Sequence, residues 1–145
     1  MTLKRLRYVS RFAQPLSPKD IDALTKQSAE NNAALDITGI LMTTGELFFQ
    51  LLEGPSDPLE RLYKKIVFDP RHTDVLLLRV EEDIEERFFP DWSMKKVEVD
   101  EASNLRLEPV REMLSSIIEQ RVRIEKLTNA LERTIWREMM DVLSD

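Results

Sequence analysis

The chain has 145 residues, of which 42% are hydrophobic and 33% are charged, a composition typical of an ordinary globular domain. It contains no cysteine, which excludes disulfides, thiolate metal sites and a cysteine nucleophile and makes a reducing, cytoplasmic compartment the expectation. The formal net charge of −6 argues against nucleic-acid binding, and no apolar run approaches the roughly 18 residues that would cross a bilayer. We therefore expect neither a nucleic acid nor a membrane as partner.

Strand and helix patterns alternate from the start of the chain. Residues 3–10 alternate in polarity and predict a strand. The helix predicted over residues 17–33 begins with a serine that can cap it, followed by a proline that suits the first helical position. Residues 37–43 and 47–52 predict two strands joined by a turn that contains Gly45.

The same alternation continues to about residue 100. The next helix is expected to be capped by Ser56 or Asp57 and has apolar residues at three- and four-residue spacing. Val75–Val80 is a continuous apolar run typical of a strand buried on both faces, and Ser93–Val99 predicts a last edge strand. The order βαββαβ with an added strand predicts an α+β, ferredoxin-like fold. Right-handed crossovers place both of its helices on one face of the sheet.

The pattern changes to a heptad repeat near the C-terminus. Val110, Ile117, Ile124 and Leu131 fall seven residues apart, which predicts a long helix whose apolar seam packs on a partner. Two polar residues interrupt this seam after Ile117, so a perfect zipper is not expected. The apolar residues from Ile135 onward leave the heptad, which is compatible with a second short helix that folds back.

The chain is therefore divided into residues 1–103, a folded domain, and residues 104–145, a C-terminal helical extension. The extension is expected to be one long helix or a helix pair. Its apolar seam fits a dimeric coiled coil, and it fits equally well an amphipathic helix that covers its own sheet.

Four polar or aromatic features do not fit a plain hydrophobic core. They are Tyr8 in the first strand, Asn31-Asn32 at the end of the first helix, Gln50 within an apolar strand, and the cluster Trp92-Ser93-Met94. Singly, each has an ordinary explanation: a core ring, a helix C-cap, a solvent-facing amide or simple packing. Together they predict a pocket between the two helices, whose amide donors and acceptors suit a flat heteroaromatic ring bearing carbonyls and ring nitrogens.

Several cations lie at the end of the second helix and in the loop that follows it. Lys65, Arg71 and His72 could hold a phosphate beside such a pocket, although the helix dipole also favours cations at any helix C-terminus.

The signatures of catalysis are missing. One histidine, no cysteine and three glycines leave no triad, metal site or phosphate-cradling loop, so an enzyme is not expected.

Six ordered blocks of sequence carry a resemblance to a known family. They are Arg7-Tyr8-Val9-Ser10, Asn31-Asn32, Ile37-Thr38-Gly39-Ile40-Leu41, Phe48-Phe49-Gln50-Leu51-Leu52-Glu53-Gly54, Asp69-Pro70-Arg71-His72 and Phe89-Pro90-Asp91-Trp92-Ser93-Met94. In order and spacing they resemble the BLUF flavin photoreceptors over about residues 3 to 100. Residues 105–127 also look like the helix that follows the sensor in bacterial photoactivated adenylyl cyclases. The chain is either a stand-alone sensor or a fragment of a longer one.

The resemblance implies a light-driven relay. By position, Tyr8 would donate an electron and a proton to the excited flavin, and Gln50 would bridge the Tyr8 hydroxyl and the N5/O4 edge of the ring. Trp92 and Met94 would be the switching pair on the last strand. An amide suits such a relay because it has a donor end and an acceptor end, and can be left rearranged when the charges recombine.

The resemblance also implies a non-covalent cofactor between the two helices: FAD, with FMN or riboflavin as alternatives. Asn32 would bond the carbonyl and N3 edge of the flavin. The other implied cofactor contacts are Gln50, Ser28 beside the glutamine region, Asn31 and Asp69 near the other polar edge, and Lys65, Arg71 and His72 near the side chain or phosphate.

These features predict a blue-light photoreceptor that forms a homodimer and signals through its C-terminal helix to an effector that the sequence does not identify. One alternative is a colourless ferredoxin-like interaction module that dimerises through the same helix. The other is an acylphosphatase-like hydrolase, which needs a glycine-rich anion loop after the first strand. Residues 11–15 contain no glycine, which argues against the hydrolase.

Overall fold

The computed structural model describes residues 2–44, 46–97, 99 and 101–144. The elements are β1 (Leu3–Phe12), α1 (Pro18–Ala34), β2 (Thr38–Thr44), β3 (Leu47–Pro55), α2 (Ser56–Val67), β4 (His72–Ile84), β5 (Lys95–Val97), α3 (Glu101–Arg106) and α4 (Glu108–Ser144). Of the residues in the predicted elements, Gly45 in the β2–β3 turn and Glu98 in the last strand lie outside the described residues. The chain divides into two compact units, Met1–Asn104 and Leu105–Asp145.

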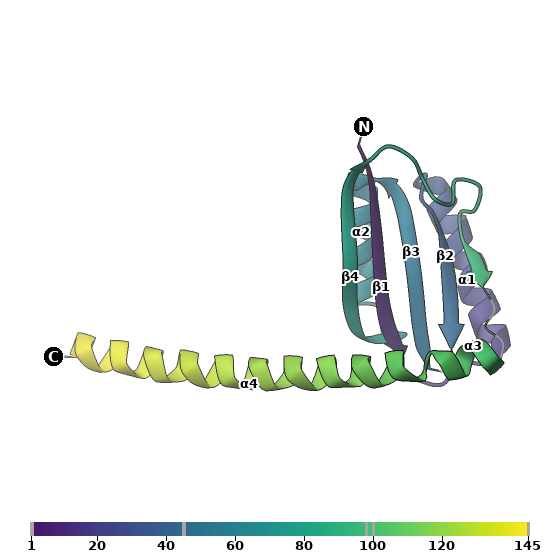
Figure 1. Ribbon diagram of the computed structural model, residues 1–145. Helices are drawn as coiled ribbons and strands as arrows, with labels where there is room; N and C mark the ends of the chain where they lie inside the picture. The colour runs from purple at the N-terminus through teal and green to yellow at the C-terminus, as the bar shows by residue number, and fades with distance from the viewer. Residues whose placement is uncertain (1, 45, 98, 100, 145) are drawn as a thin grey trace. The chain divides into compact units, whose positions relative to one another are not determined.

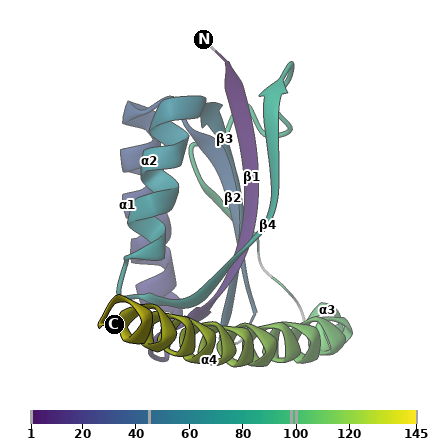
Figure 2. The same cartoon turned by 90° about the vertical axis from the view of Figure 1, so that its left-hand side faces the viewer.

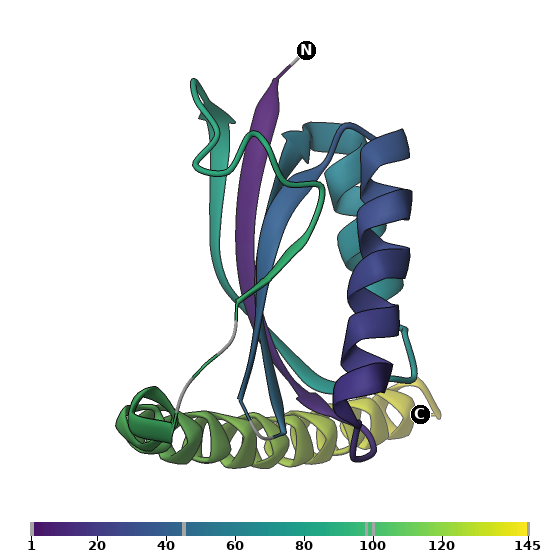
Figure 3. The ribbon, with the colours of Figure 1, turned by 90° about the vertical axis from the view of Figure 1, so that its right-hand side faces the viewer.

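The sheet of the first unit has five strands in the order β4-β1-β3-β2-β5 (Figure 1). All neighbours are antiparallel except β2 and β5, which run parallel. Helices α1 and α2 lie on the same face of this sheet (Figures 2 and 3). The predicted α+β, ferredoxin-like fold with an added strand is therefore confirmed.

Helix α1 begins where the sequence predicts, because Ser17 and Asp20 form a capping box. The Asp20 N–H donates to Ser17 Oγ at 3.1 Å, and the Ser17 N–H donates to Asp20 Oδ2 at 2.9 Å. Pro18 occupies the first turn, where a missing N–H costs no intrahelical bond. The two reciprocal bonds fix the entry of the helix that carries the predicted asparagines.

Helix α2 begins differently from the prediction. Its N-cap is Pro55, which makes no side-chain capping bond, so the expectation that Ser56 or Asp57 caps the helix is wrong. The helix instead starts at Ser56, and Asp57 lies in its first turn, where the helix dipole favours a negative charge. Strand β3 runs to Pro55, so the chain passes directly from strand to helix without a separate capping residue.

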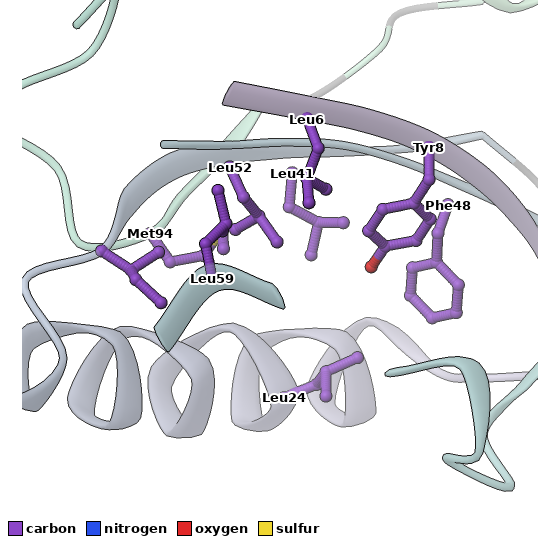
Figure 4. Packing of buried hydrophobic residues seen from close by; sticks show 9 residues of the cluster. Leu6, Tyr8, Leu24, Leu41, Phe48, Leu52, Leu59 and Met94 are labelled. Atoms are coloured by element: carbon purple, nitrogen blue, oxygen red, sulfur yellow. The ribbon is translucent and has the colours of Figure 1, made fainter. Parts of the chain in front are cut away.

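The core lies between the sheet and the two helices (Figure 4). Strands β1, β2 and β3 supply side chains that point to this side of the sheet, and the helices contribute Leu24 and Leu59. The buried cluster comprises Leu6, Tyr8, Leu24, Ile37, Leu41, Phe48, Leu52, Leu59 and Met94. Tyr8 is the polar-tipped member of this cluster, so its hydroxyl needs a partner inside the protein.

Strand β4 is less buried than its sequence predicts. The run Val75–Val80 does form a strand, but it lies at one edge of the sheet and pairs with β1 alone. Leu77, Leu78 and Val80 are 39%, 54% and 40% exposed, so burial on both faces is wrong. The order of strands decides this, because a ferredoxin-like sheet places its fourth strand outermost whatever the strand's composition.

The second unit consists mainly of α4, a continuous helix of 37 residues. At 1.5 Å per residue it is about 55 Å long. The helix continues unbroken through Ile135, so the predicted option of a second short helix folding back is wrong and the long helix is correct. Among the helices of the described residues, none is both long and apolar enough to cross a membrane.

Candidate functional site

A cavity lies beneath the two helices of the first unit, with the sheet as its floor. Its volume is about 170 Å³, far more than the roughly 15 Å³ that a single water needs, so it can admit a ring system. It is lined by Tyr8, Leu24, Ser28, Asn31, Asn32, Leu41, Phe48, Gln50, Leu62, Lys65, Ile66, Asp69, Arg71 and His72. All residues predicted to contact a cofactor are in this set.

Tyr8 and Gln50 form the polar centre of the cavity floor. Strands β1 and β3 place them directly opposite each other, and both point toward the helices. Figure 4 shows Tyr8 and Phe48 side by side, pointing from the sheet toward the helix that carries Leu24. The Tyr8 hydroxyl donates a hydrogen bond to Gln50 Oε1. Because Tyr8 is only 1% exposed, burial raises the pKa of its phenol and keeps the proton on it.

The other end of the Gln50 amide contacts Met94. Gln50 Nε2 lies 3.5 Å from Met94 Sδ, and Met94 is 9% exposed. Trp92 is not part of this contact. It is 39% exposed, its ring stacks on Phe89 with centroids 5.8 Å apart, and Lys95 Nζ lies 4.2 Å from its centroid. Of the predicted switching pair, the structure brings Met94 to Gln50 and leaves Trp92 at the surface.

The asparagines lie within the last turns of α1. The helix runs on to Ala34 with Leu35 as its C-cap, so the C-cap explanation of Asn31-Asn32 is wrong. Asn32 is buried, and its Nδ2 donates to the Ser93 carbonyl oxygen at 2.8 Å. Its side chain therefore reaches the segment before β5 while it lines the cavity. Asn31 is more exposed and lines the cavity beside it.

Charged residues gather where the chain leaves α2 and enters β4. Arg71 donates to both carboxylate oxygens of Asp69, at 3.0 Å from Nε to Oδ1 and 2.5 Å from Nη2 to Oδ2. This bidentate bond lowers the pKa of Asp69 and raises that of Arg71. The paired groups stay charged and hold the loop at the edge of the cavity.

His72 lies more deeply in the same region. Its Nδ1 is 2.7 Å from Ser10 Oγ, and its ring centroid is 4.6 Å from that of Phe48. Burial lowers the pKa of His72, which favours the neutral ring. Within the described ranges, His, Cys, Asp and Glu side chains do not gather in groups of three that could hold a metal ion.

The apolar residues that line the cavity and one buried acid were not among the predicted site residues. Leu62 and Ile66 are four residues apart on α2, with the predicted Lys65 between them, so helical spacing would have identified a cavity-facing stripe near the end of that helix. Glu53 has no exposed side-chain surface and accepts hydrogen bonds from the backbone N–H groups of Phe88 and Phe89, which lie 35 and 36 positions later in the sequence. Strand alternation does not reveal such a distant partner.

The fold and the cavity define a ferredoxin-like α+β domain with a preformed, amide-lined site between its helices. The profile of a family described as "Sensors of blue-light using FAD", abbreviated BLUF, matches residues 3–95. The chain belongs to the BLUF family, and the resemblance noted in the sequence is thereby confirmed.

Relatives and solved structures agree with this assignment. Over 94 residues the chain is 43% identical to photoactivated adenylate cyclase subunit beta of Euglena longa, a match that covers 64% of this chain and 11% of that protein. A bacterial light-regulated adenylyl cyclase has a similar structure, with a TM-score of 0.66 and 41% identity over 86% of this chain and 36% of the cyclase chain. The dark-state structure of the BLUF protein BlrB has a TM-score of 0.65 and 37% identity, and covers 78% of this chain and 83% of its own. The chain thus spans a small part of the cyclases and most of the length of BlrB.

Proposed function

We propose that this protein is a blue-light receptor that binds a flavin non-covalently in the cavity between α1 and α2 and acts as a sensor, not as an enzyme. FAD is the expected flavin, and FMN or riboflavin would fit the same ring site. The observation that carries the proposal is the hydrogen bond from the hydroxyl of the buried Tyr8 to Gln50 on the cavity floor. Membership of the BLUF family supports it independently.

The groups around the cavity fit a flavin ring. Apolar side chains from both helices, Leu24 and Ile66, line a space that a flat ring would fill. The amides of Asn32 and Gln50 offer donors and acceptors to the carbonyls and nitrogens along a ring edge. Lys65 and Arg71 supply positive charge at the cavity for a phosphorylated side chain.

The chain's own residues would carry a proton relay. A bound flavin would supply the absorption of blue light and, once excited, an acceptor for one electron. Tyr8 would give up that electron together with its hydroxyl proton, which Gln50 Oε1 is placed to accept. When the electron and proton return to Tyr8, the amide can keep a changed hydrogen-bond pattern, because its two ends differ in donor capacity. Its contact with Met94 would then change as well.

The signal would leave the domain through the C-terminal helix. Since the photochemistry consumes nothing, the output must be a shift in conformational population. Met94 immediately precedes β5, and the chain continues from β5 into α3 and α4. We propose that α4 transmits the change as part of a homodimer to an effector, either fused to it or separate.

Absorption spectroscopy tests this function. Purified protein is expected to be yellow, to shift its flavin absorption slightly to the red under blue light and to recover in the dark. Tyr8→Phe and Gln50→Leu should keep the flavin and lose the shift, because each removes one side of the relay bond. Tyr63→Phe is the matched control, since its ring lies 6.0 Å from that of Tyr8, and it should retain the shift.

Two results would contradict the proposal. A colourless protein that cannot be loaded with FAD, FMN or riboflavin would favour the interaction module instead. Normal cycling of Tyr8→Phe or Gln50→Leu would leave flavin binding intact but refute the relay.

A further inference from the structure

Glu53 is a buried carboxylate that the proposed relay does not use. It lies three residues after Gln50 on β3, and its side chain has no exposed surface. Its Oε1 accepts the Phe89 N–H at 2.8 Å, and its Oε2 accepts the Phe88 N–H at 2.9 Å. A buried carboxylate is costly unless both oxygens are paired, so these bonds hold residues 88 and 89 firmly against β3.

Arg5 completes this contact from the neighbouring strand. Its side chain is 4% exposed, and Nε donates to Glu53 Oε2 at 2.8 Å. The same guanidinium donates to the Glu86 carbonyl oxygen and to Glu81 Oε2, at 2.8 and 2.9 Å. It also lies 3.5 Å from the centroid of the Phe88 ring. Arg5 and Glu53 together fix the backbone of residues 86–89, and we call this arrangement the Arg5–Glu53 clamp.

The segment held by the clamp leads directly to the relay. Five residues after Phe89 the chain reaches Met94, whose sulfur contacts Gln50 Nε2. Between them, the Trp92 carbonyl oxygen accepts the Gly39 N–H at 2.8 Å. The segment is thus tied to β3 at both ends, by Glu53 at its start and by Gln50 at its finish. Because five residues span at most about 18 Å, the position of the clamp limits where Met94 can lie.

We propose that Glu53 is a positioning residue for the light response: with Arg5, it sets the start of the 86–94 segment so that Met94 reaches Gln50. The inference rests on the proposed function for its optical readout, but the clamp itself can be measured without light. If Glu53 only stabilised the fold, its substitution would affect folding but would not alter the light response through the position of Met94.

Glu53→Gln tests the clamp directly. It keeps the size of the side chain but puts an amide NH₂ where one oxygen accepted a backbone N–H, and it weakens the bond to Arg5. Glu85→Gln is the matched control, because Glu85 is an exposed acid immediately before this segment and the change in charge is equal.

The first measurement is amide hydrogen exchange of residues 88 and 89 in the flavin-loaded protein in the dark. Their exchange should accelerate about tenfold or more in Glu53→Gln and stay unchanged in Glu85→Gln. The second measurement is the rate of dark recovery. In Glu53→Gln the Met94–Gln50 contact of the dark state loses the support of one hydrogen bond. Recovery of the dark state should therefore slow about two- to tenfold, with flavin still bound.

A double-mutant cycle with Met94→Leu separates positioning from general support. If Glu53 acts through Met94, adding Glu53→Gln to Met94→Leu should change recovery little further. The proposal would be overturned if the effects of the two substitutions on the recovery rate multiplied. It would also be overturned if Glu53→Gln showed the hydrogen exchange and dark recovery of the wild type.

The test of the clamp remains decisive if the wild type shows no red shift or if Glu53→Gln does not fold. If the wild type shows no red shift, the proposed function fails, while hydrogen exchange still decides whether the clamp exists. If Glu53→Gln does not fold, Arg5→Lys replaces it, because lysine keeps the charge beside Glu53 but cannot also bond the Glu86 carbonyl and Glu81 in the same geometry. The same two measurements then apply.

Discussion

At the scale of single residues, we expect His72 to make the domain less stable in acid. Its ring is packed against Phe48 and bonded to Ser10, and burial lowers its pKa below the ordinary value of 6.5. Between the lowered folded value and 6.5, the unfolded chain binds a proton more readily than the folded one. The free energy of unfolding therefore falls as the pH drops through this interval.

We predict that the melting temperature falls between about pH 7 and pH 5.5, a range in which Asp and Glu side chains mostly stay ionised. The slope for one proton cannot exceed about 1.4 kcal/mol per pH unit. His72→Asn should flatten it, since the chain contains one histidine. Thermal melts at several pH values measure both proteins, and an unchanged slope in the variant would refute the assignment.

At the scale of elements, the N-terminus of α1 connects local sequence to the cavity. The Ser17–Asp20 capping box starts the helix that carries Ser28, Asn31 and Asn32 to the cavity. Its bonds are formed between residues three apart, which is why the start of this helix was predictable. The burial of β4 was misjudged, because a continuous apolar run does not report where a strand lies in the sheet, whereas the predicted ferredoxin-like order places this strand at the edge.

Removing this cap should destabilise the domain measurably. We predict that Ser17→Ala lowers the free energy of unfolding by about 1 kcal/mol and the melting temperature by a few degrees. Ser17→Asn keeps a capping acceptor and should remain close to the wild type. Urea denaturation of both variants checks this, and equal losses in the two would show that the cap is not the cause.

At the scale of the whole molecule, α4 is a long helix with an apolar seam. Ile124 and Leu131, seven residues apart, are each 61% exposed. A helix with such a seam gains most of its stability by packing on a partner, and a second copy of the same helix satisfies a heptad repeat.

We therefore predict a homodimer with a mass near twice 17.0 kDa. Ile124→Glu should convert it to a monomer by placing a charge in the seam. Val122→Glu is the matched control, because Val122 is also exposed and lies on the opposite side of the helix, so that variant should stay dimeric. Analytical ultracentrifugation in the dark and under blue light measures both variants, and a monomeric wild type in both conditions would contradict the coiled-coil output.

The sequence by itself determined the types and order of the elements from β1 to β5, the long C-terminal helix, the start of α1 and the family, but not the short helix α3. It also identified polar residues that prove to line one cavity, including Tyr8, Asn32 and Gln50. These features follow from short-range periodicity, capping chemistry and ordered motifs, all of which can be recognised in the order of residues along the chain.

Only the tertiary structure decided which distant residues meet. It left the apolar strand β4 partly exposed, brought Met94 and not Trp92 to Gln50, and paired Glu53 with the backbone of residues 88 and 89. Each of these depends on strand order and on where a long connection closes against the sheet. No local pattern encodes such contacts, because they form between segments that lie tens of residues apart in the chain.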